Sequence, residues 1–190
     1  MAGAAAVAMV AGCGSAPAGS RSAVDLEDSP GLTMSPGMQM SEPPGRGPGP
    51  TQSARMVCGT EIHHAVAQTF VLPALAPGAS SWHNRLFTCN YRLPGGPLSL
   101  SVKDSMDESS GRAYFTALRT GDGSPPLLRG LTAFGLPSYQ TPEGTVVFLK
   151  DGKTLEVDAT ALPADAGPRD ESRTDVAYAI AADVIGCWSE

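Results

Sequence analysis

Three histidines, His63, His64 and His83, are the imidazoles that this 190-residue chain offers for acid–base or metal chemistry. His63 and His64 are adjacent in a segment that predicts a helix, so their rings project about 100° apart. They cannot bind one metal ion as ligands four residues apart do, and we expect no metal site and no cofactor. The sequence also lacks Cys-x-x-Cys, His-Glu-x-x-His, Gly-x-Ser-x-Gly and Walker-loop motifs in a suitable setting. A nucleophile assembled from distant segments would leave no such motif, so a small secreted hydrolase remains an alternative function.

Acidic side chains gather at Asp104, Asp107 and Glu108. Carboxylate oxygens can bind a cation, but acidic residues at a helix start also complement the helix dipole, and we favour this second interpretation. Over the whole chain, 19 Asp and Glu against 13 Lys and Arg give a net charge of -6, and no basic cluster occurs. Because binding phosphates needs clustered cations, the composition argues against nucleic acid as a partner.

Trp82, His83 and Asn84 form the best candidate for a binding patch. They lie in a predicted loop that Gly and Ser residues flank. An exposed loop tryptophan often marks a binding surface, although such a ring can also pack against the core.

A segment with the apolar spacing of a helix follows Cys58. Ile62, Val66 and Phe70 predict a short helix from Thr60, its expected N-cap, to about Leu72.

Two alternating segments, 86–93 and 98–102, predict a β-hairpin. The four-residue loop Pro94-Gly95-Gly96-Pro97 would place Leu93 opposite Leu98, with the apolar side chains on one face.

A second hairpin is predicted at Asp151-Gly152, between segments 145–150 and 153–159. Asp-Gly favours a two-residue turn, which pairs Phe148 with Leu155 on the buried face.

The remaining elements complete an α+β domain. A helix follows Asp107 or Ser109, a strand or extended loop spans 133–139, and a final helix begins near Asp170 or Ser172. The predicted order is α-β-β-α-β-β-β-α. It favours an antiparallel sheet of about five strands with helices packed on one face.

The segment Val10-Ala11-Gly12-Cys13 resembles the lipobox of bacterial lipoproteins. The resemblance implies that Cys13 is lipidated and that residues 1–12 are the end of a signal peptide. Met1 to Gly12 contains no Lys or Arg, so the positive region of such a leader would lie upstream of Met1. The alternative is an Ala-rich N-terminus in which the cysteine occurs by chance.

A low-complexity segment separates this motif from the domain. Residues 14–54 contain seven Pro and seven Gly without apolar periodicity. We expect residues 13–54 to be a lipidated cysteine followed by a disordered tether, and residues 55–190 to be one domain.

The domain's motifs resemble those of uncharacterised cell-envelope lipoproteins of actinobacteria. They are Cys58 at the first helix, Phe87-Thr88-Cys89-Asn90-Tyr91, the glycine-flanked segment 130–135 and the hairpin 144–153. The resemblance implies a lipid-anchored domain at the outer face of the cytoplasmic membrane, and it implies no activity.

The cysteines fit an oxidising compartment. With Cys13 lipidated, Cys58, Cys89 and Cys187 remain, so at most one disulfide forms within the chain. The resemblance implies Cys58 with Cys89, which leaves Cys187 as a small buried side chain; pairing of Cys187 with either partner stays open. We expect a non-catalytic domain that binds an envelope protein, a peptide or a small ligand.

Overall fold

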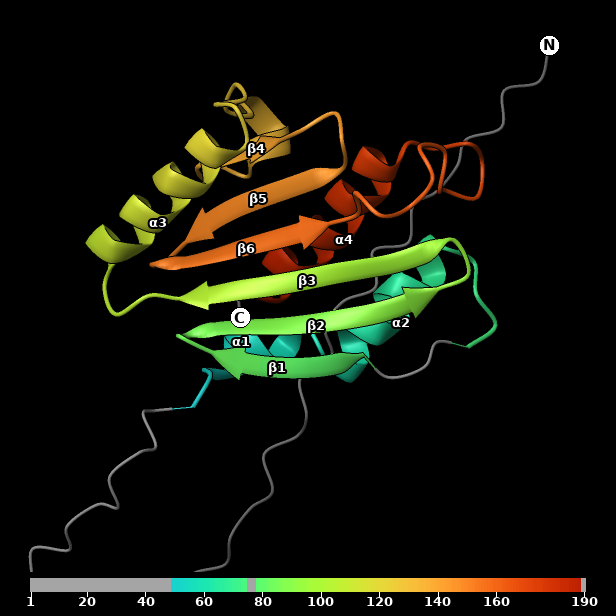
Figure 1. Cartoon of the computed structure of the whole chain (residues 1–190), viewed down its shortest axis with the longest axis horizontal. Helices are drawn as coiled ribbons and strands as arrows, with labels where there is room; N and C mark the ends of the chain where they lie inside the picture. The colour runs from blue at the N-terminus through green and yellow to red at the C-terminus, as the bar shows by residue number, and fades with distance from the viewer. Residues whose placement is uncertain (1–48, 75–77, 189–190) are drawn as a thin grey trace, which may run out of the picture. The chain divides into compact units, whose positions relative to one another are not determined.

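The computed structural model describes residues 49–74 and 78–188, which contain a six-stranded antiparallel sheet (Figure 1). The strand order is β1-β2-β3-β6-β5-β4. In chain order the elements are α1 Gln52–Met56, α2 Thr60–Thr69, β1 Ala79–His83, β2 Leu86–Leu93, β3 Gly96–Asp104, α3 Glu108–Gly121, the 3-10 helix η1 Gly130–Ala133, β4 Ser138–Gln140, β5 Thr145–Lys150, β6 Lys153–Asp158 and α4 Arg173–Cys187. The predicted α+β class is confirmed, with six strands in place of about five.

The hairpin of β5 and β6 forms as predicted. Asp151 and Gly152 have φ angles of 50° and 72°, as a two-residue type I′ turn requires. Phe148 lies opposite Leu155. The turn also packs closely on α3, because a Cβ built on Gly111 would lie 2.5 Å from the carbonyl oxygen of Gly152.

The hairpin of β2 and β3 has a different register from the predicted one. Leu93 lies opposite Gly96, and Leu98 lies opposite Tyr91. Pro94 and Gly95 alone form the turn, because Gly96 adopts a φ of 141° and can begin β3 directly. The shift is two residues, so the side chains keep their predicted faces.

Strand β1 is missing from the predicted order. Its sequence, Ala-Ser-Ser-Trp-His, has no apolar alternation, and four of its five residues are exposed. It pairs only with β2 at the edge of the sheet, through a turn at Asn84 and Arg85. An edge strand with little buried surface gives no hydrophobic pattern to detect.

Helix α1 lies partly inside the segment predicted to be tether. Thr51 caps it by accepting a hydrogen bond from the backbone N–H of Ala54, and the Ala54 side chain is buried. The backbone N–H of Thr51 donates to Asp104 at the end of β3. The ordered domain therefore begins a few residues before the predicted residue 55; residues 13–48 lie outside the described residues.

Helices cover both faces of the sheet, so the prediction of helices on one face is wrong. Helices α1, α2 and α4 pack on the face that carries the main core, and α3 covers β5 and β6 on the other (Figure 1). There Phe115 of α3 packs with Tyr139, Val147 and Leu149. The reason is that β5 is apolar at four consecutive positions, 146–149, and both of its faces need cover.

For α3 and for α4, one of the two predicted N-cap candidates is the N-cap in the structure. Asp107 caps α3 by accepting a hydrogen bond from the N–H of Ser110, which holds the pKa of that carboxyl below its usual value. Ser172 and Asp175 form a capping box at α4. Helix α2 differs, because Gly59 and not Thr60 is its N-cap.

Among the described residues, no helix combines the length and the apolar character that crossing a bilayer requires.

Candidate functional site

Trp82, His83 and Asn84 lie in the β1–β2 hairpin, so the prediction of a loop is wrong for Trp82 and His83, which belong to β1. Trp82 is half-buried and packs against the main core, so it contributes no fully exposed ring. His83 ends β1, and Asn84 occupies the turn at a φ of 49°, with both side chains exposed. A binding role for this patch stays a prediction.

The carboxylates considered as a cation site have separate structural roles. Asp107 caps α3 and Glu108 lies in its first turn, as the dipole interpretation predicts. Asp104 is buried and accepts a hydrogen bond from the backbone of Thr51.

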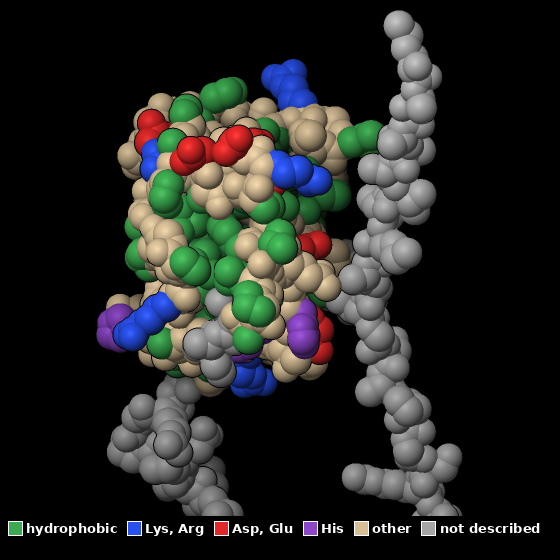
Figure 2. Space-filling model, turned by 90° about the vertical axis from the view of Figure 1, so that its right-hand side faces the viewer, with side chains coloured by type: hydrophobic (Ala, Val, Ile, Leu, Met, Phe, Trp, Pro, Cys, Tyr) green, Lys and Arg blue, Asp and Glu red, His purple; other side chains and the backbone are tan. Residues whose placement is uncertain are grey.

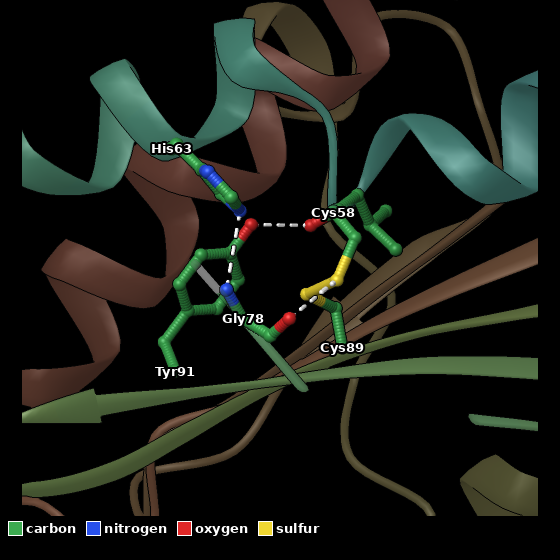
Figure 3. Close-up of a disulfide and its surroundings, with 6 residues drawn as sticks. Cys58, His63, Gly78, Cys89 and Tyr91 are labelled. Carbon is green, nitrogen blue, oxygen red and sulfur yellow. Dashed lines mark hydrogen bonds between the residues drawn. A yellow bond between two sulfur atoms is a disulfide. The ribbon is translucent and has the colours of Figure 1, made fainter. Parts of the chain in front are cut away.

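Cys58 and Cys89 form the predicted disulfide, which ties the start of α2 to β2 (Figure 3). Cys89 is fully buried and Cys58 is half-buried. Cys187, at the end of α4, is half-buried and is not a free thiol, so the expectation of a buried unpaired side chain is wrong. Cys13 lies outside the described residues.

His63 lies beside the disulfide, and together the three side chains form what we call the Cys58–His63–Cys89 cluster. Its two sulfur atoms and one imidazole nitrogen all lie within 4.8 Å of one another. The position of His63 close to Cys58 results from how α2 begins. With Gly59 as N-cap, Cys58 is the residue before the cap and His63 is the fourth residue of the helix. Side chains at these two positions regularly pack together at helix starts.

The His63 ring is held from two sides (Figure 3). Its Nε2 accepts a hydrogen bond of 3.3 Å from the backbone N–H of Gly78. The ring also meets Tyr91 edge to face, with centroids 5.3 Å apart. Burial, and then the neighbouring charge of His64, lower the pKa of His63. An unprotonated Nε2 is the form that can accept the Gly78 hydrogen bond.

Tyr91 contacts the His63 ring and the backbone just before Cys58. Its side chain is fully buried, and its hydroxyl donates to the carbonyl oxygen of Val57, the residue before Cys58. Burial raises the Tyr91 pKa above its ordinary value, so the phenol stays protonated. The backbone of Gly78 packs directly against the disulfide. A Cβ at this position would lie 2.3 Å from Cys89 Sγ, so a larger residue would not fit.

Surface hollows surround the C-terminal end of α2, and we call this surface the α2-end groove. A hollow of about 850 Å³ is lined by Thr60, His63, His64, Ala67, Gln68, Val71, Leu72, Pro73 and Ala74. A second, of about 480 Å³, lies between α2 and the first turns of α4 with the segment that precedes them, and shares Gln68 and Val71 with the first. A third, of about 310 Å³, shares Leu72 and reaches the β2–β3 turn. The volumes fall in the range of small-molecule sites.

Most of the residues that line the third hollow are apolar. It is lined by Phe70, Leu72, Leu93, Pro94, Gly95, Leu162, Pro163, Asp165 and Ala166. Figure 2 views the domain from the side on which the β2–β3 turn lies and shows hydrophobic side chains gathered in the middle of this face, with charged side chains around them.

Val71 lines the first and second hollows and has a strained backbone conformation. Its φ is 52° and the residue is 71% exposed. The N–H of Leu72 donates to the carbonyl of Ala67, so Val71 holds the position after the helix where glycine is the usual residue. A β-branched residue at positive φ is a clear outlier, and such strain is concentrated at functional sites.

The described residues do not place an imidazole in a catalytic arrangement. His63 hydrogen-bonds a backbone amide, and no hydrogen bond joins His64 or His83 to a serine hydroxyl or a carboxylate in the part of the chain that the structure describes. The hydrolase alternative stays a prediction.

Sequence reasoning missed the cluster and the groove. The spacing Cys58-Gly59-Thr60-Glu61-Ile62-His63 carries a usable signal, since the residue before a helix N-cap often packs against the fourth residue of the helix. Val71 gives no such signal, because its backbone angle depends on where α2 ends. Comparisons with protein-family models, with curated proteins and with solved structures find no significant match to this chain.

Proposed function

We propose that this protein is a lipid-tethered domain of the bacterial cell envelope that binds a partner protein, peptide or small ligand in the α2-end groove. Val71 is the observation that carries the binding part. Glycine would occupy its position without strain, yet the chain keeps an apolar, β-branched side chain there, exposed between two hollows. A contact between the Val71 side chain and a bound ligand would offset the backbone strain at this position.

The lipid-tethered part of the proposal is supported by the lipobox-like segment that ends at Cys13 and by the Pro- and Gly-rich residues after it. The Cys58–Cys89 disulfide is consistent with an oxidising compartment. A tether would let the domain search for partners near the membrane and would raise their effective concentration.

Site-specific photocross-linking in the native envelope tests the binding part. A photoreactive residue at Gln68, which is exposed and lines two hollows, should form adducts with one recurrent partner. The same residue at Arg92, exposed on β2 and facing away from the main core, is the matched control. Val71→Asp should reduce the Gln68 adducts severalfold, since it places a charge in the groove. Equal adducts from both positions, or adducts insensitive to Val71→Asp, would contradict the proposal.

The lipid anchor is tested separately by expressing the chain with a complete leader. Cys13→Ala should release the domain to the medium or leave an unprocessed precursor. A correctly cleaved Cys13→Ala protein that stays in the membrane fraction would refute the anchor. So would a disulfide between Cys13 and Cys187 in a non-reducing peptide map, because a sulfur in a disulfide cannot carry the lipid thioether.

A further inference from the structure

The cluster beside α2 combines three ligand groups that thiophilic metal ions prefer. Two cysteine sulfurs and one imidazole nitrogen converge within 4.8 Å. In tetrahedral zinc sites, with Zn–S near 2.3 Å and Zn–N near 2.0–2.1 Å, ligand atoms lie roughly 3.5–3.8 Å apart. Once the disulfide is reduced, its sulfurs can separate to that distance. The Cα atoms of Cys58 and Cys89 are 5.5 Å apart, so side-chain rotation is enough.

We propose that the reduced form of the Cys58–His63–Cys89 cluster is a three-ligand site for a thiophilic cation, Zn²⁺ or Cu⁺, and that the disulfide closes this site. Each of the three residues offers one ligand atom to a metal ion. Cys58 and Cys89 supply thiolates, and His63 supplies Nε2, which faces the cluster and now accepts the Gly78 N–H. The ion would take the place of that hydrogen-bond donor.

The surroundings favour the ligand-competent forms. Cys58 directly precedes the N-cap of α2, where the positive end of the helix dipole stabilises a thiolate. With Zn²⁺, two thiolates and one neutral imidazole give a site of zero net charge, which a half-buried position tolerates. Tyr91 packs against the His63 ring and limits its rotation, as groups around metal ligands commonly do. His63 also lines the α2-end groove, which gives the ion a path from solvent.

The chemistry balances with a dithiol reductant. Its thiolate attacks Cys58 Sγ, the less buried sulfur, and Cys89 leaves as a thiolate. The second thiol of the reductant then displaces Cys58, so the reductant becomes a disulfide and the protein gains two thiols. Binding of the ion releases the two thiol protons to solvent. Oxidation reverses the sequence and expels the ion, so metal binding is coupled to redox state. This inference does not depend on the proposed function.

Titration of the full chain with Co²⁺, a spectroscopic substitute for Zn²⁺, tests the site. The Cys13→Ala chain is reduced with a phosphine under nitrogen, and its fold is checked by circular dichroism. We expect one Co²⁺ per chain with sulfur-to-cobalt charge-transfer absorption, displaced by one equivalent of Zn²⁺; a parallel titration with Cu⁺ shows which ion binds more tightly. His63→Ala should weaken binding by about tenfold or more, since it removes a ligand. His64→Ala and Cys187→Ser are matched controls that should leave the affinity unchanged.

A second measurement needs no variant at His63. In the reduced chain, Zn²⁺ should protect Cys58 and Cys89 from alkylation and leave Cys187 reactive, as read by peptide mass spectrometry. Metal binding of equal strength by the oxidised chain would overturn the proposal. So would equal loss of affinity in His63→Ala and His64→Ala, protection of Cys187 alone, or a reduced chain that unfolds and stays unfolded with Zn²⁺.

Discussion

Replacing Val71 by glycine should stabilise the domain and weaken its binding surface. The left-handed conformation costs a residue with a Cβ about 1–2 kcal/mol, and Val71 pays this cost at a φ of 52°. Val71 is 71% exposed, so removal of its side chain forfeits little burial. Glycine's greater freedom in the unfolded chain offsets about 0.5–1 kcal/mol of the gain. The middle values of these two ranges give a free energy of unfolding for Val71→Gly that is higher by about 0.75 kcal/mol.

Urea unfolding followed by circular dichroism measures this change. The midpoint should rise with an unchanged slope, and the melting temperature should rise by about 2–4 °C for a domain of this size. Val71→Ala is the matched control, because alanine keeps the Cβ and therefore most of the strain. If Val71→Gly is no more stable than the original chain, or if Val71→Ala gains as much as Val71→Gly, the strain argument fails. In the cross-linking experiment, Val71→Gly should also lower the yield of adducts at the groove.

Three further predictions concern the disulfide, the histidine and the two-sided sheet. Removal of the Cys58–Cys89 disulfide by the double variant Cys58→Ala/Cys89→Ala, at positions 31 residues apart, should lower the free energy of unfolding by about 3–4 kcal/mol in urea titrations; an unchanged midpoint would argue against it. Because the folded-state pKa of His63 is lowered, the unfolded chain binds its proton more readily, so stability is complete above the ordinary value of 6.5 and falls as pH drops through and below it. His63→Gln should flatten this part of the stability–pH profile, and an unaltered profile would show that His63 is not responsible. Phe148→Ala should cost about 3–5 kcal/mol and Leu149→Ala about 2–4 kcal/mol, because both side chains are buried on opposite faces; a Leu149→Ala cost below about 1 kcal/mol would mean that α3 does not cover that face.

Local sequence patterns predict those elements whose signals lie within a few residues. The Asp151-Gly152 turn sets the register of β5 and β6, since both residues tolerate the positive φ that the turn needs. The alternation in segment 86–93 predicts β2 and its buried face. Asp170 and Ser172 predict the start of α4 to within a few residues, and the structure selects Ser172.

Elements with weak local signals were missed for an identifiable reason. Strand β1 contributes few apolar side chains, and α1 is only five residues long, so tertiary contacts and not intrinsic preferences hold them in place. The cover of β5 by α3 likewise depends on what packs against each face. Its apolar run at 146–149 indicates two buried faces but cannot say which helix covers the second.

The amino-acid sequence by itself determined the α+β class, the presence of two hairpins, the register of the β5–β6 hairpin and the cysteines available for pairing, because turns, caps and periodicity act over short separations. Only the tertiary structure decided that His63 meets the Cys58–Cys89 disulfide and that Val71 stands exposed between hollows. The first depends on β2 lying beneath the start of α2, and the second on the residue at which α2 ends. Both are set by packing between segments distant in sequence, which no local pattern encodes.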